Sequence, residues 1–327
     1  MEMEHKISVF EKIIDEAAGK VLKGCMPRTL FAPAEYILSL GGKRLRPLLT
    51  LMSADLFGKN PDDVIDAALA VEIFHNFSLV HDELMDKADL RRGYQTIHKK
   101  WSENNAILTG DALVIEAYRY IAKVPVDVLP DILTLFTTTA MDICKGQQYD
   151  MDFEQRLDVT EAEYLEMIHL KTAVLIGCAL KIGAIIAGAP ARDADLLYEF
   201  GINIGLAFQL KDDLLDVYGS PETFGKKIGG DILCNKKTFL LIQCLKNANN
   251  GQRAELNKWL TATDYNPDEK IKYVKNIYDE LNLKAVVDSL IEKYYLASLE
   301  YLSLINLPDD QKKDLVSLAE NLMHREK

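Results

Sequence analysis

The stretch HNFSLVHDELMDKADLRRG, residues 75–93, decides how the rest of the chain is interpreted. An α-helix has 3.6 residues per turn, so side chains three or four positions apart share one face. Four polar side chains of the stretch have this spacing: His75, Ser78, Asp82 and Asp86. Two carboxylates one turn apart repel each other and lose hydration in apolar surroundings, so a cation should compensate them.

The oxygen ligands of this helix face favour Mg²⁺, which binds one or two carboxylates and completes its coordination with water and substrate phosphates. Arg91 and Arg92 follow at once, and guanidinium groups match the geometry of phosphate oxygens. Taken alone, the stretch is also explained as a solvated acidic helix face beside a basic turn. A metal site therefore needs a second indication.

A second acidic helix supplies that indication. The segment GLAFQLKDDLLDVY, residues 205–218, again carries aspartates one helical turn apart. One helical face holds Gly205, Phe208, Gln209, Asp212, Asp213 and Asp216. We interpret the two apolar helices, each with aspartate at positions i and i+4, as two walls of one metal-diphosphate site.

The composition is that of a globular chain, with 48% hydrophobic and 27% charged residues among 327. The net charge of −12 argues against binding to nucleic acid or to an anionic membrane surface, because both require a basic face. The two acidic motifs lie in different halves of the chain, and no linker separates these halves. We therefore expect one domain over residues 1–327.

The N-terminal stretch MEMEHKISVFEKIIDEA is charged throughout, unlike a signal peptide. Five cysteines without a CxxC pair predict reduced, mostly buried thiols in a cytoplasmic protein. The most apolar stretch, residues 172–190, is interrupted by Lys181 and three glycines. We interpret it as a buried core helix and expect no transmembrane segment, with a membrane span as the alternative interpretation.

Helical periodicity runs through nearly the whole chain, and no stretch has the alternating pattern of a strand. Besides the helices that carry the acidic motifs and residues 171–172, predicted helices cover 4–24, 29–40, 47–57, 104–122, 131–153, 252–261, 267–281, 283–304 and 308–324. Residues 160–163 form a capping box, and Asn266-Pro267 is a helix start. The segment GSPETFGKKIGG, residues 219–230, is the clearest loop.

The side chains suited to chemistry are acids and cations rather than a nucleophile with its base. The acids are Asp82, Asp86, Asp212 and Asp216, and the cations are Lys43, Arg46, Arg91, Arg92, Lys171, Lys226 and Lys236. Histidines and cysteines do not cluster as zinc ligands do. Cations together with Mg²⁺ suit the stabilisation of a departing diphosphate, and a dry apolar pocket would protect a carbocation from water.

Seven motifs resemble the trans-isoprenyl diphosphate synthase (polyprenyl synthetase) family, in the order that the family shows. They are GGKRLRP at 41–47, HNFSLVHDELMD at 75–86, RRG at 91–93, GQQYD at 146–150, KT at 171–172, FQLKDDLLD at 208–216 and GKKIGGD at 225–231. The resemblance covers about residues 38–238. It implies an all-α, single-domain bundle of long helices around a central cavity, and a homodimer with an active site in each subunit.

The resemblance also implies a role for each matching residue. Asp82, Asp86 and Asp212, supported by Asp213 and Asp216, would hold three Mg²⁺ ions on an allylic prenyl diphosphate. Arg91, Lys171 and Lys226 would bind the same diphosphate, while Lys43, Arg46, His75 and Arg92 would bind isopentenyl diphosphate. Gln147 and Asp150 would line the metal side, Thr172 and Gln209 would face the developing cation, and Lys236 would be a further substrate-binding cation.

Two departures from the family pattern concern the first acidic motif and the glycine-rich loop. The family has aspartate at the second position of DDxxD, where this chain has Glu83. At 100° per residue Glu83 points away from Asp82 and Asp86, so activity should survive. In the loop, Lys227 adjoins Lys226. Both lysines are candidates for the diphosphate contact, and Lys226 is the favoured one.

Two other kinds of protein are weighed against a synthase. A class I terpene cyclase shares the helical fold, but its second metal motif usually mixes Asn, Ser or Thr with Glu, and it lacks an isopentenyl diphosphate site. A non-catalytic or modulatory subunit usually loses one acidic motif. Here both motifs are intact and GGKRLRP is present.

Product length is predicted from the residues that precede Asp82 on the first acidic helix. Ser78, one turn away, is small, whereas Phe77 lies five residues away, about 7.5 Å along the helix axis. In relatives an aromatic residue at the Phe77 position limits the chain to short products. We therefore expect the C20 product geranylgeranyl diphosphate, with C15 farnesyl diphosphate as the second candidate.

Overall fold

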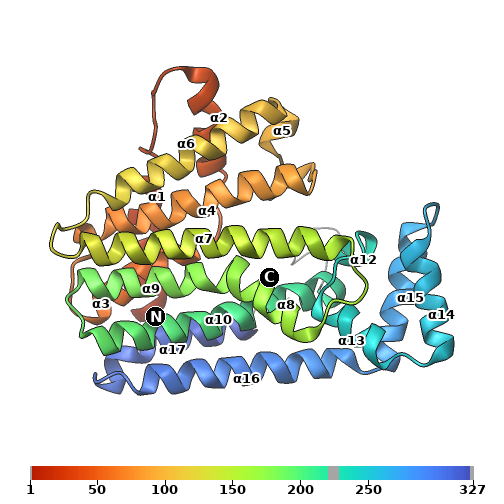
Figure 1. Cartoon of the computed structure of the whole chain (residues 1–327). Coiled ribbons are helices and arrows are strands. Elements are labelled where there is room, and N and C mark those ends of the chain that lie inside the picture. Colours follow the sequence, from red (N-terminus) through yellow and green to blue (C-terminus); the bar gives the residue numbers. More distant parts are fainter. Residues whose placement is uncertain (1, 220–227, 325–327) are drawn as a thin grey trace. The chain divides into compact units, whose positions relative to one another are not determined.

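The computed structural model describes residues 2–219 and 228–324, and most of them lie in helices (Figure 1). This confirms the all-α prediction. An antiparallel hairpin joins β1 (Leu90–Arg91) to β2 (Tyr94–Gln95). The expectation that the chain has no strand was therefore wrong. The chain reverses at Arg92 and Gly93, whose φ angles of 51° and 80° are positive.

The chain forms two compact units. The first comprises Met1–Ala140, Leu175–Gly201 and Tyr301–Leu315, and the second comprises Met141–Val174, Ile202–Glu300 and Val316–Lys327. A single domain over residues 1–327 stays a prediction.

Besides the hairpin, the first unit contains α1 (Glu2–Ala18), α2 (Arg28–Ser39), α3 (Leu45–Leu56), the 3₁₀ turn η1 (Pro61–Asp63), α4 (Ile65–Met85), α5 (Ile97–Lys100), α6 (Glu103–Ile121) and most of α9 (Val174–Ile186). The second contains α8 (Glu161–Ile168), the π-helical turn η2 (His169–Ala173), α12 (Gly230–Leu233), α13 (Phe239–Asn247), α14 (Asn250–Thr261) and α15 (Pro267–Glu280). Both take residues from α7 (Leu129–Glu154), α10 (Ala191–Tyr218), α16 (Leu283–Ser303) and α17 (Asp309–His324).

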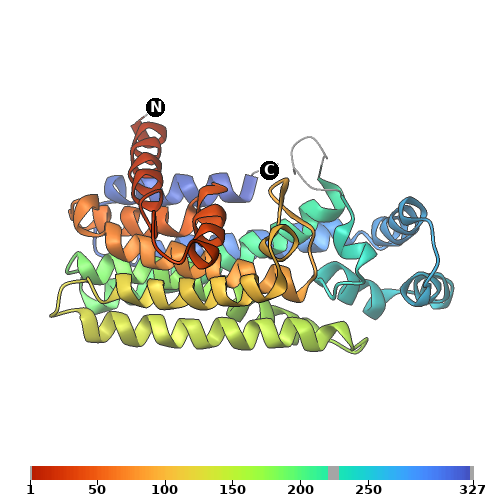
Figure 2. The same ribbon diagram turned by 90° about the horizontal axis from the view of Figure 1, so that it is seen from above.

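The core of the first unit includes the long contact between α4 and α6, which run side by side (Figures 1 and 2). Gly110 of α6 lies against the ring of His81, and a Cβ atom at this glycine would collide with the ring. His81 Nε2 lies 3.1 Å from the Ile107 carbonyl and donates to it, because a carbonyl only accepts. These contacts hold the acidic end of α4 against α6.

The apolar helix α9 packs against α3 in the same unit. A Cβ atom at Gly183 would collide with the Thr50 carbonyl, and Ser53 Oγ donates a 2.6 Å hydrogen bond to the Leu180 carbonyl. The run Glu161–Ile186 is long and apolar enough to cross a membrane, but 78% of its most apolar part is buried within the protein. Such burial is typical of a core helix, which is how the sequence was interpreted. A cytoplasmic location stays a prediction.

Two predictions about the N-terminal region and the cysteines were wrong. The first helix ends at Ala18 rather than near residue 24, and the turns that follow at 19–24 include positive φ angles of 58° at Leu22 and 75° at Gly24. All five cysteines are free, as expected, but only Cys178 and Cys244 are buried; Cys25, Cys144 and Cys234 are exposed.

Helix starts in the second unit follow the predicted capping signals. The Thr160 amide donates to Glu163 Oε2 over 2.8 Å, and the Glu163 amide donates to Thr160 Oγ1 over 3.2 Å. Asn266 caps α15, with Pro267 at its first position. α15 packs against both α12 and α14. The capping box at 160–163 and the start at 266–267 are thus confirmed.

Candidate active site

The first acidic motif lies at the C-terminal end of α4. Asp82 is partly exposed in the last helical turn, and Asp86 is the exposed C-cap residue. The Asp86 amide donates a 2.8 Å hydrogen bond to the Asp82 carbonyl. Glu83 is only 2% exposed. The helix therefore turns the two aspartates outward and Glu83 inward, as the helical period predicted.

Glu83 forms an ion pair with Nε of Arg91 on β1. Burial raises the pKa of the Glu83 carboxyl, and the Arg91 guanidinium opposes this rise. The pair holds Arg91 beside the acidic motif. Sequence reasoning recognised that Glu83 points away from the two aspartates, but it missed this partner. The sequence signal for this ion pair was an arginine eight residues after an acid that the helical period turns inward.

Arg44 is a second residue whose role the sequence analysis missed. Its side chain is buried, and Nη1 donates to Glu72 Oε1 over 2.6 Å while Nη2 donates to the Leu38 carbonyl over 2.7 Å. Asn76 also donates to Glu72 Oε1, over 3.0 Å. This buried network fixes the basic loop onto α4. Glu72 was the signal, since it is a lone charge within the apolar run AALAVEIF.

His75 and Arg46 meet in the first unit, with Nε2 and Nη1 3.2 Å apart. A guanidinium group can only donate, so His75 accepts here as a neutral imidazole. Burial lowers the pKa of His75 well below its ordinary value, and the positive charges of Arg46, Arg91, Arg92 and Arg44 lower it further. His75 is therefore a hydrogen-bonding group within a cluster of arginines.

The glycine pair before Lys43 receives Arg92. Arg92 Nη1 donates to the Gly41 carbonyl. Gly42 has a φ of 134°, and a Cβ atom there would lie 2.5 Å from Cζ of Arg92. Glycine is therefore required for this approach. Lys43 is exposed on the same loop. The structure thus brings together in one unit the set that the resemblance assigns to isopentenyl diphosphate: Lys43, Arg46, His75 and Arg92.

Phe77 belongs to a series of aromatic rings in the first unit. Its ring packs edge-to-face on Phe74 and on His81, with centroid distances of 5.1 and 5.0 Å. Phe74 packs in turn on Phe136, at 5.2 Å. Ser78 is partly buried, and its hydroxyl donates to the His75 carbonyl. These contacts restrict the Phe77 ring, and its role in limiting product length stays a prediction.

In the second unit, the predicted pair Lys171 and Thr172 lies in the π-helical turn η2. Such turns widen a helix locally and are frequent at functional sites. Gly146 of α7 allows the turn to come close, because a Cβ atom there would collide with the Lys171 amide. Lys171 Nζ lies 2.6 Å from Asp150 Oδ2, and Lys236 Nζ lies 3.9 Å from the same oxygen. Burial would raise the pKa of Asp150, but the two ammonium groups together lower it.

Thr172 and Gln209 also meet, and they belong to a longer series of hydrogen bonds. Thr172 Oγ1 donates to Gln209 Oε1 over 2.9 Å, and Gln209 Nε2 donates to Asp213 Oδ1 over 2.9 Å. The Tyr164 hydroxyl bonds to Asp213 Oδ2. Burial raises the pKa of Asp213 to about 7, and Asp231 adds to the rise. Sequence reasoning gave Asp213 a supporting role and missed Tyr164, which no motif marks.

The remaining residues of the second motif are partly exposed. Asp216 Oδ1 accepts a 2.9 Å hydrogen bond from the Asp231 amide, which ties the start of α12 to α10. Asp212 and Gln147 are partly buried. Lys226 and its neighbour Lys227 lie outside the described residues, so their assignment stays a prediction.

Each acidic motif offers a pair of carboxylates one helical turn apart. Within residues 2–219 and 228–324, no three His, Cys, Asp or Glu side chains converge as a ready metal site. Mg²⁺ usually takes only one or two protein carboxylates and keeps water or substrate phosphate oxygens in its other positions. The oxygen-only donor sets Asp82 with Asp86 and Asp212 with Asp216 therefore fit a hard divalent cation that is shared with a diphosphate.

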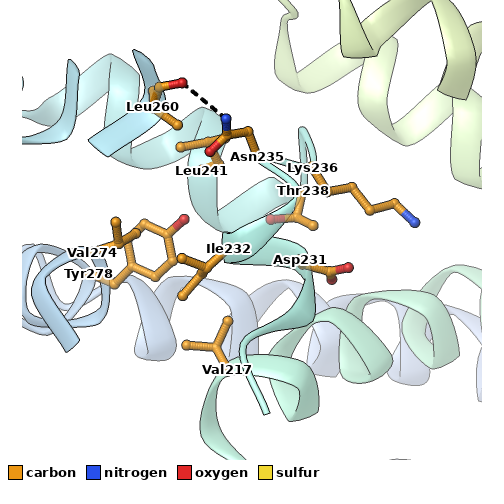
Figure 3. A pocket seen from close by; sticks show the side chains of 10 residues that line it. All are labelled: Val217, Asp231, Ile232, Asn235, Lys236, Thr238, Leu241, Leu260, Val274 and Tyr278. Atoms are coloured by element: carbon orange, nitrogen blue, oxygen red, sulfur yellow. Dashed lines mark hydrogen bonds between the residues drawn. The ribbon is translucent and has the colours of Figure 1, made fainter. Parts of the chain in front are cut away.

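A small pocket in the second unit borders Asp231 and Lys236 (Figure 3). Its apolar side is formed by Val217, Ile232 and Tyr278, while the charged ends of Asp231 and Lys236 extend to the other side. The cavity volume of about 10 Å³ has room for about one water molecule. This pocket is therefore too small to hold a prenyl chain.

Comparison with known proteins gives the family. Residues 27–280 match the family model described as polyprenyl synthetase. A geranylgeranyl diphosphate synthase of Methanosarcina mazei is 43% identical over 236 residues, 71% of this chain and 72% of that protein. A short chain isoprenyl diphosphate synthase of Methanothermobacter thermautotrophicus is 33% identical over 327 residues, 100% of this chain and 99% of that protein.

A solved structure supports the same assignment. A crystal structure of a geranylgeranyl pyrophosphate synthase superimposes with a TM-score of 0.93 at 45% sequence identity, covering 98% of this chain and 99% of that one. None of these relatives is named as a terpene cyclase or as a non-catalytic subunit. The sequence match, the fold and the paired acidic motifs agree, and the chain belongs to the polyprenyl synthetase family of trans-prenyltransferases.

Proposed function

We propose that this chain condenses isopentenyl diphosphate head-to-tail with allylic prenyl diphosphates to make a short-chain trans-prenyl diphosphate. The observation that carries the proposal is that each acidic pair has a set of cations in its own unit. The first unit holds the arginine and histidine cluster around His75, and the second holds Lys171 and Lys236 around Asp150. Such cations suit diphosphate groups.

The metal in this proposal is Mg²⁺, with three ions per active site. Asp82 and Asp86 would hold two of them, and Asp212 would hold the third with support from Asp216. Bound Mg²⁺ would neutralise negative charge on the diphosphate and stabilise it as a leaving group. Support comes from the spacing and the partial or full exposure of the four aspartates and from their oxygen-only chemistry.

The two substrates would use different cations. Lys43, Arg46, His75 and Arg92 would bind isopentenyl diphosphate, and Arg91, Lys171 and Lys226 would bind the allylic diphosphate, with Lys236 as a further contact. The neutral His75, which accepts from Arg46, would orient that guanidinium toward a phosphate oxygen. Gln147 and Asp150 would line the metal side, and the ion pair of Asp150 with Lys171 would fix the position of the lysine.

The reaction would proceed by ionisation of the allylic diphosphate, condensation and elimination. The C–O bond of the allylic substrate breaks with its electron pair leaving on the diphosphate, and the double bond of isopentenyl diphosphate attacks the cation. Loss of a proton to the released diphosphate then forms the new double bond. Thr172 and Gln209 would present oxygen dipoles to the cation.

The assay that tests this proposal measures incorporation of labelled isopentenyl diphosphate into allylic primers with and without Mg²⁺. A prenyl diphosphate that appears only with metal is expected. A cyclised hydrocarbon formed from the primer alone would instead favour a terpene cyclase, and no product without a partner protein would favour a modulatory subunit.

We further propose that the main product is the C20 compound geranylgeranyl diphosphate, with C15 as the second candidate. The geranylgeranyl diphosphate synthase activity that two relatives are named for supports C20. Phe77, held by Phe74 and His81, would form the floor of the chain-length cavity, and the small Ser78 would leave room above it.

Replacement of Phe77 by Ala tests this floor. The variant should lengthen the product by at least one isoprene unit, as measured by mass spectrometry of the released alcohols. Leu296→Ala, which shortens an exposed apolar side chain of α16, is the matched control and should leave the product length unchanged. An active Phe77→Ala variant with the wild-type product distribution would rule out Phe77 as the floor.

A homodimer is the third element of the proposal. Three apolar side chains of α6, Ile107, Leu108 and Ile115, are 45%, 56% and 63% exposed, and a row of such residues favours burial against another subunit. Light scattering at micromolar concentration should give twice the 36.8 kDa chain mass. A monomer under these conditions would overturn the assignment.

A further inference from the structure

The series of hydrogen bonds from Tyr164 through Asp213 and Gln209 to Thr172 has a fixed direction. The Gln209 amide nitrogen can only donate, so it must face Oδ1 of Asp213, and this places Oε1 against Thr172. Oε1 can only accept, so Thr172 Oγ1 donates its single hydrogen to it. The lone pairs of the Thr172 hydroxyl therefore point away from Gln209.

This direction requires the ionised form of Asp213, whose two oxygens only accept, and therefore holds above its pKa of about 7. An asparagine in its place could present either an oxygen or an NH₂ group to Gln209. If the Gln209 amide turned over, Thr172 would become an acceptor, and its hydrogen would point to the side where its lone pairs now lie. A hydroxyl hydrogen repels a positive charge that a lone pair would attract.

The chemical nature of these four hydrogen-bonded side chains argues against a role in packing alone. Tyr164 is 1% exposed and Asp213 is 6% exposed, yet the two hydrogen-bond partners of this acid are neutral groups. Burying an acid without a directly paired cation is unfavourable, and an apolar side chain would join α8 to α10 without that penalty. Unlike an apolar side chain, the acid orients the two groups that donate hydrogen bonds to it, the Tyr164 hydroxyl and the Gln209 amide.

We propose that Tyr164 and Asp213 are positioning residues, which fix the Gln209 amide and the Thr172 hydroxyl so that both turn oxygen lone pairs toward the positive allylic carbon of the reaction. The inference rests on the proposed function, because that function places a cation beside Thr172. Tyr164 holds Oδ2 of the acid, which leaves Oδ1 directed at Gln209.

The test uses Tyr164→Phe, which removes one hydroxyl and keeps the ring, and Asp213→Asn. Calorimetry with Mg²⁺ measures the affinity of the full chain for two unreactive allylic diphosphate analogues. One analogue carries a protonated amine in place of the carbon that becomes positive, and the other keeps a neutral carbon there with a thio linkage. Tyr218→Phe is the matched control. It also removes one tyrosine hydroxyl from the second unit, but that hydroxyl donates to Asp279, which is not part of the hydrogen-bond series.

A positioning role predicts a loss that is specific to positive charge. Tyr164→Phe should weaken binding of the amine analogue about two- to twelve-fold, the range for one lost hydrogen bond, and leave binding of the neutral analogue unchanged. Its kcat should fall by a similar factor at constant KM, as expected for an interaction made only in the transition state. Asp213→Asn should act in the same direction and more strongly.

Two outcomes would overturn the inference. Equal losses for both analogues would mean that the hydrogen-bond series only shapes the fold, and unchanged binding of both would mean that it does not act on the cation. If Asp213→Asn fails to fold, the nearly isosteric Tyr164→Phe carries the test alone. Absence of prenyl product from the wild-type chain would instead contradict the proposed function, so the two failures are distinguishable.

Discussion

The two acidic motifs have the same outline but hold their buried acid with partners of different charge. In both, the first and last aspartates are partly or fully exposed, and the acid after the first aspartate is turned inward. Glu83 of α4 is paired with a full positive charge, Arg91. Asp213 of α10 is held by the neutral hydroxyl of Tyr164 and the neutral amide of Gln209.

Under the proposed function, the difference lets one pattern of acids serve two purposes. An ion pair fixes a guanidinium group near Asp82 and Asp86, the aspartates that we propose as metal ligands, where a bound diphosphate would need positive charge. Neutral donors fix orientation without adding charge, which suits a place beside a carbocation, because a second cation there would oppose ionisation. We call the partly or fully exposed aspartates Asp82, Asp86, Asp212 and Asp216 the outer aspartates, and the buried Glu83 and Asp213 the inner acids. The predictions below test whether the outer aspartates have the same role and the inner acids have different roles.

The largest effect is expected at the outer aspartates. Asp82→Ala and Asp212→Ala should each lower kcat at least about a hundredfold, because each removes a ligand of the metal that stabilises the leaving group. Circular dichroism should show an unchanged helix content. Steady-state assays with Mg²⁺ measure the effect.

Asp66→Ala is the matched control for Asp82→Ala. Asp66 lies on the same helix, where its partner is Lys123 on the surface, and its loss should leave kcat unchanged. Near wild-type turnover of Asp82→Ala would contradict the metal assignment. Equal damage from Glu83→Ala would mean that the exposed face of α4 has been misidentified.

The next effect separates the two substrates. Arg46→Ala should raise the KM for isopentenyl diphosphate about ten-fold or more, since a charge-assisted contact contributes roughly 1.5–3 kcal/mol. Lys171→Ala should do the same for the allylic primer. Arg28→Ala, whose partner is Glu35 on the surface, is the control. A larger effect of Arg46→Ala on the allylic KM would reverse the assignment.

A smaller effect is expected at the inner acid of the first motif. Glu83→Ala releases Arg91, so the KM for the allylic primer should rise about three- to ten-fold while kcat falls far less than in Asp82→Ala. In a double-mutant cycle with Arg91→Ala, the two changes should not add, because both remove one interaction. Glu116→Ala removes a similar pair with Arg119 and should leave the KM unchanged. Strict additivity would mean that Glu83 acts independently of Arg91.

The parts of this site that follow helical periodicity were predictable from the sequence. The 100° advance per residue determines that Asp82 and Asp86 share a face and that Glu83 does not, whatever α4 packs against. Helix starts were predictable where the cap is local, as at Thr160 and Asn266. In each case the deciding interactions lie within a few residues of one another.

The parts that depend on distant partners were not predictable. The buried ion pair of Arg44 joins residues 28 positions apart, and the Tyr164–Asp213 bond spans 49. The π-helical turn at Lys171 depends on the close approach of Gly146, which no local pattern reveals. The hairpin at 90–95 has strands of two residues, too short to show alternation. These features depend on tertiary contacts that a single sequence does not specify.

The smallest effect concerns the pH dependence of the first unit. The pKa of His75 is lowered by burial and by the surrounding arginines, so the folded chain keeps His75 neutral at a pH where the unfolded chain protonates it. Below about pH 6.5 the unfolded state binds the extra proton, and the stability of the folded state falls as pH decreases from there toward the folded pKa. His75→Gln keeps an acceptor for Arg46 and removes the titration, so its Tm should fall less than that of the wild type between pH 7.5 and 5.5. Between pH 7.5 and 8.5, where His75 is neutral in both states, the wild type and the variant should respond alike.

Parallel Tm curves down to pH 5.5 would contradict this assignment of His75. They would mean that His75 accepts a proton in the folded chain as readily as in the unfolded one, and that it is not the neutral acceptor of Arg46.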